Sequence, residues 1–526
     1  MARRVRNDVL IAVLLFVAGI ATRLPFRSRL LYSFDSVNFA LGMERFNLAD
    51  HQPHPPGYIV YVALARVINY FVGDANNTLV AMSVIAGAMA VVMIYFIASA
   101  IFDQTVGKVA AVLLLFSPLS WFYSEIALSY EVALPLALAV TWFLYQLYFF
   151  RRGATAAAII LGLAAGVRQD LLLFLGPIWF VGTLRIGRRM MLISWATLIV
   201  AAAAWFTPLI YLTGGLSAYL HVGKSQFNAG VQPTSIFEMG LRGIAINLKL
   251  IVGAIVWLLG AATVALIYLV SLVSQPKRFY TDRRVWFLAL TPSLALAFFT
   301  FFLFDPAGYL LVYSGTLIII GARVISLMAQ DAEHLRRRLR LVWFLPVFLI
   351  IVAAANTILF TDTAKFDWHI PFNNDTIAST FKVYSENEVT QTVNDTQLIL
   401  DAVREFDPHK TMVVGINPPD RLAADWRRLL YYLPEYQTVW LLSLPDGGYL
   451  VTTEHYFYRK RGQKQVTVPE AYTDVLFVNI EPDKISRETE LIIDDLPGTS
   501  VRSLKMPLTG SVVAEDYYLV HEGATS

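Results

Sequence analysis

The chain lacks cysteine and has little charge. None of its 526 residues is cysteine, which excludes disulfides, thiol-attached haem and cysteine-ligated zinc. Charged residues make up 15% of the chain, against roughly 25% in soluble globular proteins. Hydrophobic residues make up 56%, and runs longer than about 18 apolar residues recur, which a soluble core does not need. This composition indicates an integral membrane protein. The small net charge of +3 gives no reason to expect a nucleic-acid partner.

The expected fold is a polytopic α-helical membrane protein with about 11 spans and a C-terminal soluble α/β domain. The pair at 154–184 is the least separated, because its only polar break is Val167-Arg168-Gln169-Asp170. The N-terminus also resembles a signal peptide, but no small-x-small cleavage site follows its apolar core, so we favour an uncleaved first span. We place the spans at 8–24, 78–101, 105–123, 131–150, 154–167, 170–184, 190–212, 250–273, 286–304, 309–328 and 341–360.

Clusters of lysine and arginine in short loops set the expected orientation. With the N-terminus in the cytoplasm, the odd number of spans places the C-terminus outside. Segment 58–72 decides this assignment, because counting it as a span would invert every later loop. We therefore interpret it as an interfacial helix on the outer leaflet, and we expect the protein in a bacterial inner membrane. The basic clusters then fall inside, at 3–6, 108, 151–152, 185–189, 277–284 and 336–340.

The composition changes near residue 362, which suggests two domains. We expect a transmembrane domain at 1–362, whose first outer loop, 25–77, holds interfacial helices at 36–47 and 58–72. Residues 363–526 are more polar, and no glycine-rich phosphate loop or zinc-ligand spacing occurs among them. Short apolar bursts there are typical of buried strands. We expect strands at 411–415, 438–442 and 475–479 and helices at 395–405 and 420–432, in a domain exported from the cytoplasm.

Asp35 lies just past the first apolar segment, at the start of a helical pattern. A carboxylate in this position has two interpretations. It is the N-cap of that helix and accepts backbone N–H bonds, or it is a general base that takes a proton from an acceptor hydroxyl. The two are compatible, because capping would hold the carboxylate in place. Asp35 is the candidate catalytic residue.

A rigid turn, His54-Pro55-Pro56-Gly57-Tyr58, begins nineteen residues after Asp35. Two prolines restrict the backbone, and the glycine permits a reversal into the 58–72 helix. His54 and Tyr58 are candidate substrate-binding residues, although His54 is also explained as a satisfied loop histidine. Asp50, His51 and His54 could supply metal ligands, but histidines three apart across a proline do not share a helical face. We therefore assign no metal site, and a divalent metal cofactor has no support in the sequence.

Two further outer regions offer groups for a sugar. Residues 117–131 combine Glu125 and Glu131 with hydroxyls and aromatic rings. These acids either bind sugar hydroxyls or only snorkel to the membrane surface. Tyr309 opens a span after a tight turn and is a further candidate contact, although turn chemistry alone explains that sequence.

Arg168, Lys224 and Arg242 stand as isolated cations on the outer side. Each is either a lipid-headgroup contact or a clamp for a lipid phosphate, which a guanidinium binds through two parallel N–H bonds. Arg168 is the strongest candidate. It lies at the polar break of 154–184, where an arginine is costly unless it reaches water, a headgroup or a ligand.

Together these motifs resemble the GT-C membrane glycosyltransferases, especially subgroups related to protein O-mannosyltransferases and to the lipid A aminoarabinose transferase. The resemblance implies that the transmembrane domain is catalytic, that Asp35 is the base, that the donor is a polyprenyl-phosphate sugar and that the anomeric centre is inverted. Many members have two adjacent acids where this chain has Asp35 and Ser36, so the resemblance supplies no carboxylate pair for a metal. It covers roughly residues 8–330 and rests on Phe34-Asp35-Ser36, the His54–Tyr58 turn, the 117–131 loop, 162–168 and 306–310.

The predicted activity is transfer of a hexose or pentose from a polyprenyl-phosphate donor to a hydroxyl of a glycan, lipid or protein acceptor outside the membrane. Two rivals remain: a polytopic transporter or lipid flippase, and an inactive relative whose exported domain binds sugars. A transporter would favour charged or broken segments near the bilayer midplane, whereas the acids here cluster at one face.

Overall fold

The chain divides into two compact units. The structure is a computed structural model, and it describes residues 2–232, 235–304, 306–339, 343–362, 384–416, 426–443, 449–453, 460–461, 465–478, 493–495, 501–505, 511–514 and 517–521. We call Met1–Ser28 with Pro55–Glu388 the membrane unit, and Arg29–His54 with Val389–Ser526 the C-terminal unit. The short segment 29–54 thus packs with residues more than 300 positions later in the chain.

The membrane unit is a bundle of apolar helices. Among the described residues, eight helices are long and apolar enough to cross a membrane, and a bent pair makes a ninth candidate. Two shorter apolar helices, α8 (Ala154–Val167) and α9 (Asp170–Thr183), account for the remaining expected segments, so the predicted fold class is confirmed. The long helices are α1 (Ala2–Arg23), α4 (Ala75–Ile101), α7 (Ser129–Phe150), α10 (Arg188–Leu212), α13 (Leu241–Leu259) continuing through η5 (Gly260–Ile267) and α14 (Tyr268–Leu272), α15 (Arg283–Phe301), α16 (Gly308–Leu339) and α17 (Phe344–Thr361).

The segment expected as one span at 105–123 is broken. It consists of α5 (Gln104–Leu115) and α6 (Pro118–Glu125), which meet at 54°. Ser117 starts the second helix: its Oγ accepts from the Ser120 amide at 3.4 Å, and Pro118 occupies the first helical position. Proline suits that position and interrupts the helix before it, because it has no N–H to donate. The expectation of a continuous helix here is wrong.

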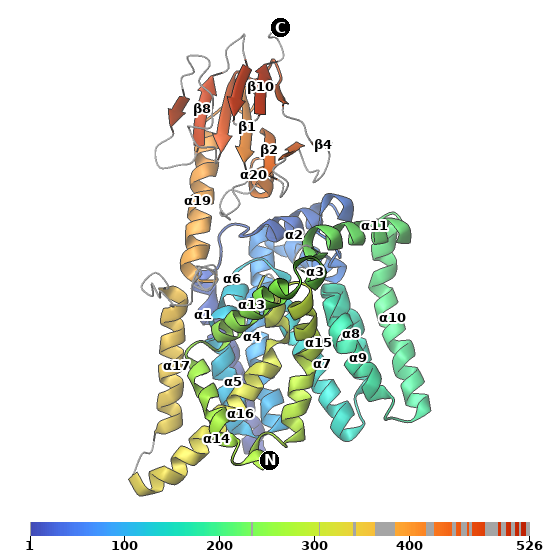
Figure 1. Ribbon diagram of the computed structural model, residues 1–526, viewed down its shortest axis with the longest axis vertical. Helices are drawn as coiled ribbons and strands as arrows, with labels where there is room; N and C mark the ends of the chain where they lie inside the picture. Colours follow the sequence, from blue (N-terminus) through green and yellow to red (C-terminus); the bar gives the residue numbers. More distant parts are fainter. Residues whose placement is uncertain are drawn as a thin grey trace. The chain divides into compact units, whose positions relative to one another are not determined.

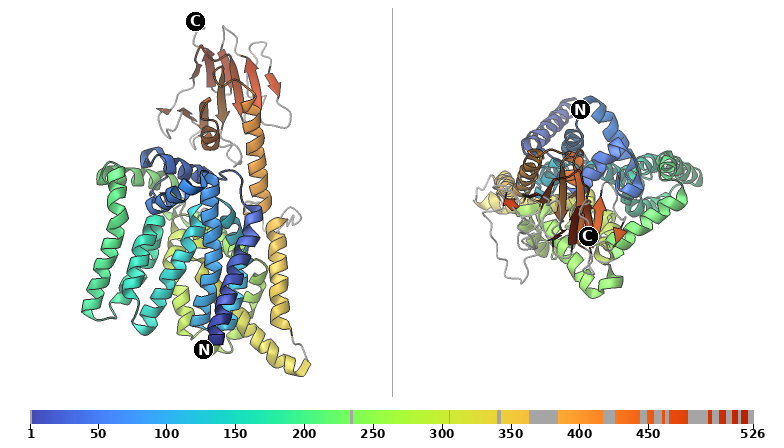
Figure 2. Two further views of the ribbon diagram at one scale, coloured as in Figure 1. Left: turned by 180° about the vertical axis from the view of Figure 1, so that it is seen from behind. Right: turned by 90° about the horizontal axis from the view of Figure 1, so that it is seen from above.

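The connections between the membrane helices lie at two opposite ends of the bundle. Figure 1 shows the N-terminus, the α7–α8 turn, the α9–α10 turn and α14 at one end of the bundle, and the reverse view agrees (Figure 2). At the opposite end, α3 (Ile59–Val72) and α11 (Leu216–Gln226) run across the bundle (Figure 1). Gly214 and Gly215, both with positive φ, allow the chain to leave α10 sharply and enter α11.

The C-terminal unit is an α/β structure. Its larger sheet has the order β4-β3-β2-β1-β6-β8-β7, in which β2, β1 and β6 are parallel and the outer strands antiparallel. The three parallel strands match the expected strand segments. The expected helices correspond to α19 (Glu386–Arg404) and α20 (Trp426–Tyr432), while residues 420–425 lie outside the described part. The strands are β1 (Thr411–Ile416), β2 (Gln437–Ser443), β3 (Tyr449–Thr453), β4 (Lys460–Arg461), β6 (Asp474–Val478), β7 (Ile493–Asp495) and β8 (Val501–Lys505), and a second sheet joins β5 (Gln465–Val468), β10 (Tyr517–His521) and β9 (Ser511–Ala514).

Segment 29–54 contains α2 (Phe34–Glu44), the short η2 (Leu48–Asp50) and the start of the proline turn. The buried core of the C-terminal unit is formed by α19, α20, β1 and β6, and the side chains of Leu30 and Phe34 pack against it. This packing is hydrophobic and not visible in local sequence, because the two partners are separated by hundreds of residues.

Candidate functional site

Asp35 lies in the first turn of α2 but does not cap it. The cap is Ser33, whose Oγ accepts from the Ser36 amide at 3.2 Å, while the Ser33 amide donates to Ser36 Oγ at 3.3 Å. The N-cap interpretation of Asp35 is therefore wrong, because α2 begins at Phe34, which makes Ser33 the N-cap and places Asp35 inside the first helical turn. The Asp35 side chain is 39% exposed, so its carboxylate can reach a substrate.

His54 lies beside that carboxylate. Its Nδ1 is 3.4 Å from Asp35 Oδ1, and its side chain is only 12% exposed. The ring packs against Phe39 of α2, with 5.0 Å between ring centroids. A Cβ on Gly42 would lie 2.8 Å from the nitrogen of Pro53, so the turn sits directly on α2 and only glycine fits between them. The structure thus brings together the two residues that the sequence placed nineteen positions apart.

The remaining polar groups of the turn are engaged in holding it. Asp50 accepts a hydrogen bond from Asn47 Nδ2 at 2.5 Å. Burial, helped by neighbouring His54 and Arg427, lowers the pKa of His51 to about 4, so His51 is neutral at neutral pH. Within the described residues no group of three or more His, Asp or Glu side chains is placed to hold a metal ion.

Arg168 lies in a second cluster, in the membrane unit between α8 and α9. Its Nε and Nη2 donate to the two oxygens of Asp170 at 3.2 and 3.4 Å, and its Nη1 donates to Ser129 Oγ at 3.1 Å. The guanidinium carbon lies 4.3 Å from the ring centre of Tyr130 and 5.7 Å from those of Tyr58 and Tyr309. We call these six residues the arginine cage.

The cage changes the interpretation of Arg168. The residue is not an isolated cation, because Asp170 pairs with it, and it is not spread on a lipid surface, because it is only 3% exposed. Asp170 is fixed from the other side by the Tyr313 hydroxyl, which donates to its Oδ2 at 3.2 Å. Three of the five guanidinium N–H groups take part in these hydrogen bonds, and the other two bond no acceptor in the described part of the chain.

Glu125 and Glu131 are fully buried among the helices and do not join the cage. Glu131 Oε1 accepts from Ser120 at 2.8 Å. Neither Glu125 oxygen has a hydrogen-bond partner within the part of the chain that the structure describes. The nearby Arg23, also fully buried, supplies positive charge to both. Neither acid snorkels to a surface, and contact with a sugar would require these helices to separate, so their substrate role stays a prediction.

Lys224 and Arg242 are exposed, on α11 and α13. The structure brings neither into the arginine cage, and neither side chain forms a hydrogen bond or ion pair with another described residue. Their assignment to a donor phosphate stays a prediction.

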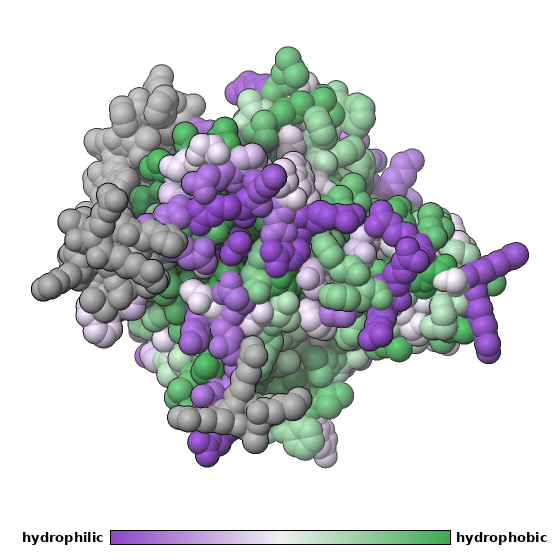
Figure 3. Space-filling view, turned by 90° about the horizontal axis from the view of Figure 1, so that it is seen from below, coloured by the Kyte–Doolittle hydropathy of each residue, from purple (hydrophilic) through white to green (hydrophobic). Residues whose placement is uncertain are grey.

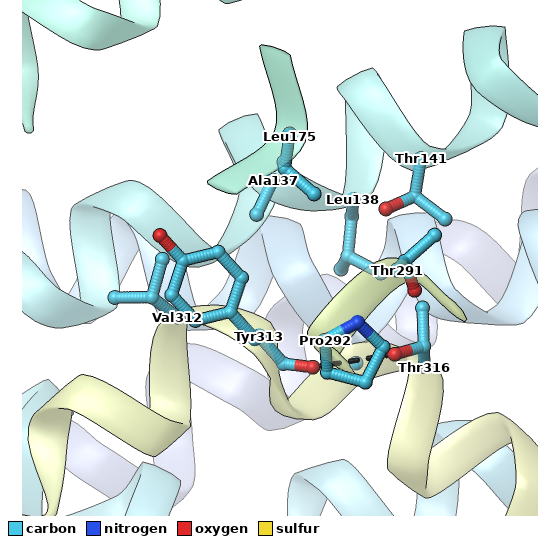
Figure 4. Close-up of a pocket in the computed structure, with 10 residues that line it drawn as sticks. Ala137, Leu138, Thr141, Leu175, Thr291, Pro292, Val312, Tyr313 and Thr316 are labelled. Carbon is cyan, nitrogen blue, oxygen red and sulfur yellow. Dashed lines mark hydrogen bonds between the residues drawn. The ribbon is translucent and has the colours of Figure 1, made fainter. Parts of the chain in front are cut away.

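A small cavity lies between α7, α9, α15 and α16, lined by Thr141, Thr291 and Thr316 among apolar side chains (Figure 4). Its volume of about 10 Å³ holds roughly one water molecule. The cavity is therefore too small for a sugar. Tyr313 lines this cavity, and its hydroxyl donates to Asp170 of the arginine cage.

Sequence reasoning missed several partners in these clusters. Asp170 ends the polar break that contains Arg168. Its position two residues after Arg168 was the one signal in the sequence for an ion pair between them. Ser129 and Tyr130 belong to the 117–131 segment considered as a sugar contact, but nothing in the sequence linked them or Tyr313 to Arg168, because helix packing sets these neighbours.

Comparison with known proteins identifies the fold. No protein-family model and no curated protein sequence matches the chain. A crystal structure of ArnT from Cupriavidus metallidurans bound to undecaprenyl phosphate covers 83% of this chain and 86% of its own, at 12% identity and a TM-score of 0.50. ArnT, the lipid A aminoarabinose transferase, is a GT-C protein. The chain has the GT-C fold.

Solved structures of archaeal oligosaccharyltransferases also match this chain, with lower TM-scores. The Archaeoglobus fulgidus enzyme in complex with zinc and sulfate covers 81% of this chain and 62% of its own, at 14% identity and a TM-score of 0.41. The fold agrees with the family resemblance that the motifs around Asp35 and His54 indicated.

Proposed function

We propose that this protein is an inverting membrane glycosyltransferase that uses a polyprenyl-phosphate sugar as donor. The GT-C fold supports the class of reaction. The observation that carries the proposal is the Asp35 carboxylate, which is relieved of capping by Ser33, remains 39% exposed and has His54 at 3.4 Å. The sugar transferred is a hexose or a pentose, and the acceptor is a hydroxyl of a glycan, lipid or protein.

Asp35 acts as the general base in this proposal. It takes the proton of the acceptor hydroxyl while the acceptor oxygen bonds to the anomeric carbon of the sugar. The bond between that carbon and the phosphate oxygen breaks on the opposite face, and its electron pair leaves with the polyprenyl phosphate. The configuration at the anomeric carbon is therefore inverted. His54 restricts the Asp35 side chain, which lowers the orientational freedom lost when substrate binds.

Arg168 binds the donor phosphate in this proposal. Two of its N–H groups are not used by Asp170 or Ser129. The surrounding rings of Tyr58, Tyr130 and Tyr309 exclude water, which strengthens a charge-assisted hydrogen bond. The catalytic and phosphate-binding roles rest on different units of the chain and are tested separately.

The proposal includes an orientation. Arg151, Arg152 and Arg185 line a recess of about 510 Å³ at the end of the bundle that carries the N-terminus. Figure 3 views the molecule from this end and shows hydrophilic residues spread over it. Positively charged loops favour the cytoplasmic side of a membrane. We therefore place this end of the bundle on the cytoplasmic side of a bacterial inner membrane. A reporter active only outside the cytoplasm should work after Ser526 and stay silent within 276–278; the opposite pattern contradicts this orientation.

Replacement of Asp35 by asparagine tests the catalytic role. Asp35→Asn keeps the shape of the side chain but cannot accept the proton, and we expect turnover to fall about 10²- to 10⁴-fold with normal protein accumulation. Glu44→Gln is the matched control, because it removes an exposed carboxylate from the last turn of the same helix. Full transfer activity in Asp35→Asn would exclude Asp35 as the base.

A further inference from the structure

Within the C-terminal unit, one buried arginine joins α20 to segment 29–54, which carries Asp35. Arg427 of α20 is 0% exposed. Its Nε donates to Asn38 Oδ1 at 3.0 Å, and its Nη2 donates to the carbonyl oxygens of Asp50 at 2.6 Å and His51 at 3.3 Å. The guanidinium carbon also lies 5.9 Å from the ring centre of Phe34.

These bonds reach both halves of the Asp35–His54 pair. Asn38 lies on α2 three residues after Asp35, and residues three apart in a helix are neighbours on its surface. The carbonyl of His51 precedes His54 by three residues in the turn. One rigid, planar group thus fixes the helix that carries the carboxylate and the turn that carries the imidazole.

Other contacts place the same segment on α20. The Tyr432 hydroxyl accepts from the Leu31 amide at 2.9 Å, and Phe34, next to Asp35, packs on the core of the C-terminal unit. A packed contact and a hydrogen bond at the entry to α2 leave little freedom for its first turn. Arg427 bonds the backbone of the turn at 48–54, which follows α2.

We propose that Arg427 is a positioning residue, and that the C-terminal unit serves the reaction by holding Asp35 and His54 in register. This inference rests on the proposed function of Asp35. It gives the α/β part of the chain a role other than sugar binding: it is the scaffold of the loop that carries the base. A lysine at position 427 would keep the charge, but its single nitrogen cannot occupy the positions of both Nε, which bonds α2, and Nη2, which bonds the turn, so we expect it to lose at least one of these contacts.

The chain offers a matched control in the adjacent residue. Arg428 is 1% exposed and lies on the same helix, and its Nη1 donates to Thr396 of α19 at 3.1 Å. Arg427→Lys and Arg428→Lys therefore make the same chemical change at equal burial. The first removes the side chain that bonds Asn38, Asp50 and His51, and the second removes one that bonds α19.

The experiment uses the full-length protein in lipid vesicles with a polyprenyl-phosphate sugar. Because the chain has no cysteine, Ala49→Cys provides a unique site for a spin label at an exposed residue of the otherwise mostly buried turn at 48–54. We expect Arg427→Lys to raise the mobility of this label, to lower kcat about tenfold or more and to leave the donor KM within about twofold, since misplacement of a base by about 1 Å can cost up to 10²-fold. Arg428→Lys should leave label mobility and kcat near those of the unsubstituted chain.

Three outcomes would overturn the inference. Unchanged label mobility in Arg427→Lys shows that the arginine does not hold the turn. A mobile label with full kcat shows that holding the turn does not serve the reaction. Equal losses in both lysine variants show only general destabilisation of the C-terminal unit. Failure of the proposed function is distinguishable, because full activity in Asp35→Asn would exclude the base while leaving the label measurement unaffected.

Discussion

Replacement of Arg168 by lysine separates a ligand-binding role of the arginine cage from a structural one. Lysine keeps the positive charge but has one nitrogen, so it cannot bond both oxygens of Asp170, Ser129 and a phosphate together. If Arg168 binds the donor phosphate, the donor KM should rise about tenfold or more, where each factor of ten corresponds to ~1.4 kcal/mol. The turnover number at saturating donor should change little.

The alanine variant has a larger structural cost. It leaves Asp170, whose side chain is 21% exposed, with only the Tyr313 hydroxyl as a hydrogen-bond partner among the described residues. Breaking a buried ion pair by removing one partner costs about 3–5 kcal/mol, and the partial exposure of Asp170 suggests the lower limit, about 3 kcal/mol. Arg168→Ala should therefore accumulate less than Arg168→Lys.

Asp170→Asn provides the decisive comparison. It breaks the same ion pair but keeps the cation, and because an amide retains only one acceptor oxygen it releases one of the two N–H groups that Asp170 now occupies. A purely structural pair predicts that Arg168→Lys and Asp170→Asn have the same effect on activity. A phosphate-binding arginine predicts opposite effects: a higher donor KM in the first variant, and an unchanged or lower donor KM in the second.

The assay is initial-rate transfer from a polyprenyl-phosphate sugar at varied donor concentration, with protein level checked in each variant. Arg185→Lys is the control, because Arg185 also lies over a tyrosine ring, at 4.7 Å from Tyr148, but at the other end of the bundle. An unchanged donor KM in Arg168→Lys and Arg168→Ala would remove Arg168 from the phosphate site. The exposed cations Lys224 and Arg242 would then be the remaining candidates for binding the donor phosphate.

Two further predictions concern packing and pH. In Gly308→Ala the new Cβ would lie 2.6 Å from the Tyr130 ring. We therefore expect the free energy of unfolding to fall by about 1–3 kcal/mol, which should appear as faster thermal inactivation together with a raised donor KM. Gly253→Ala, with no atom within 4 Å of the added Cβ, should behave like the unsubstituted chain, and equal inactivation of the two variants would contradict the argument. Because the folded-state pKa of His51 is lowered from 6.5 to about 4, its stabilising contribution is complete above pH 6.5 and is lost as the pH falls toward 4, by roughly 3 kcal/mol in full. The mobility of a label at Ala49 should rise over that range and stay flat in His51→Gln; equal pH dependence in both would refute this assignment.

Much of the fold could be read from sequence because its causes are local. A membrane span needs about 20 apolar residues in a row, and buried parallel strands need short apolar runs, so β1, β2 and β6 appeared at their expected places. The break between α5 and α6 was missed, although Ser117-Pro118 is a helix start in sequence. The residues on both sides of Ser117-Pro118 are strongly apolar, so the segment was interpreted as one continuous span.

The candidate site was only partly predictable. The turn sequence and the position of Asp35 identified that residue together with His54, because each carries a local signal. The local sequence did not show that Ser33 rather than Asp35 caps α2. Both residue types cap helices well, and the outcome depends on where the first helical turn begins.

The amino-acid sequence by itself determined the membrane class of this protein, its number of apolar segments, the α/β nature of its C-terminal part and the residues that suggest a base and a phosphate contact. Only the tertiary structure decided which of these residues meet. Arg168 is neutralised by Asp170 and enclosed by tyrosines from three other segments of the chain, and Arg427 bonds Asn38 across 389 residues of sequence. Periodicity and composition act along the chain, whereas these pairings follow from which buried polar groups must find partners once the helices pack.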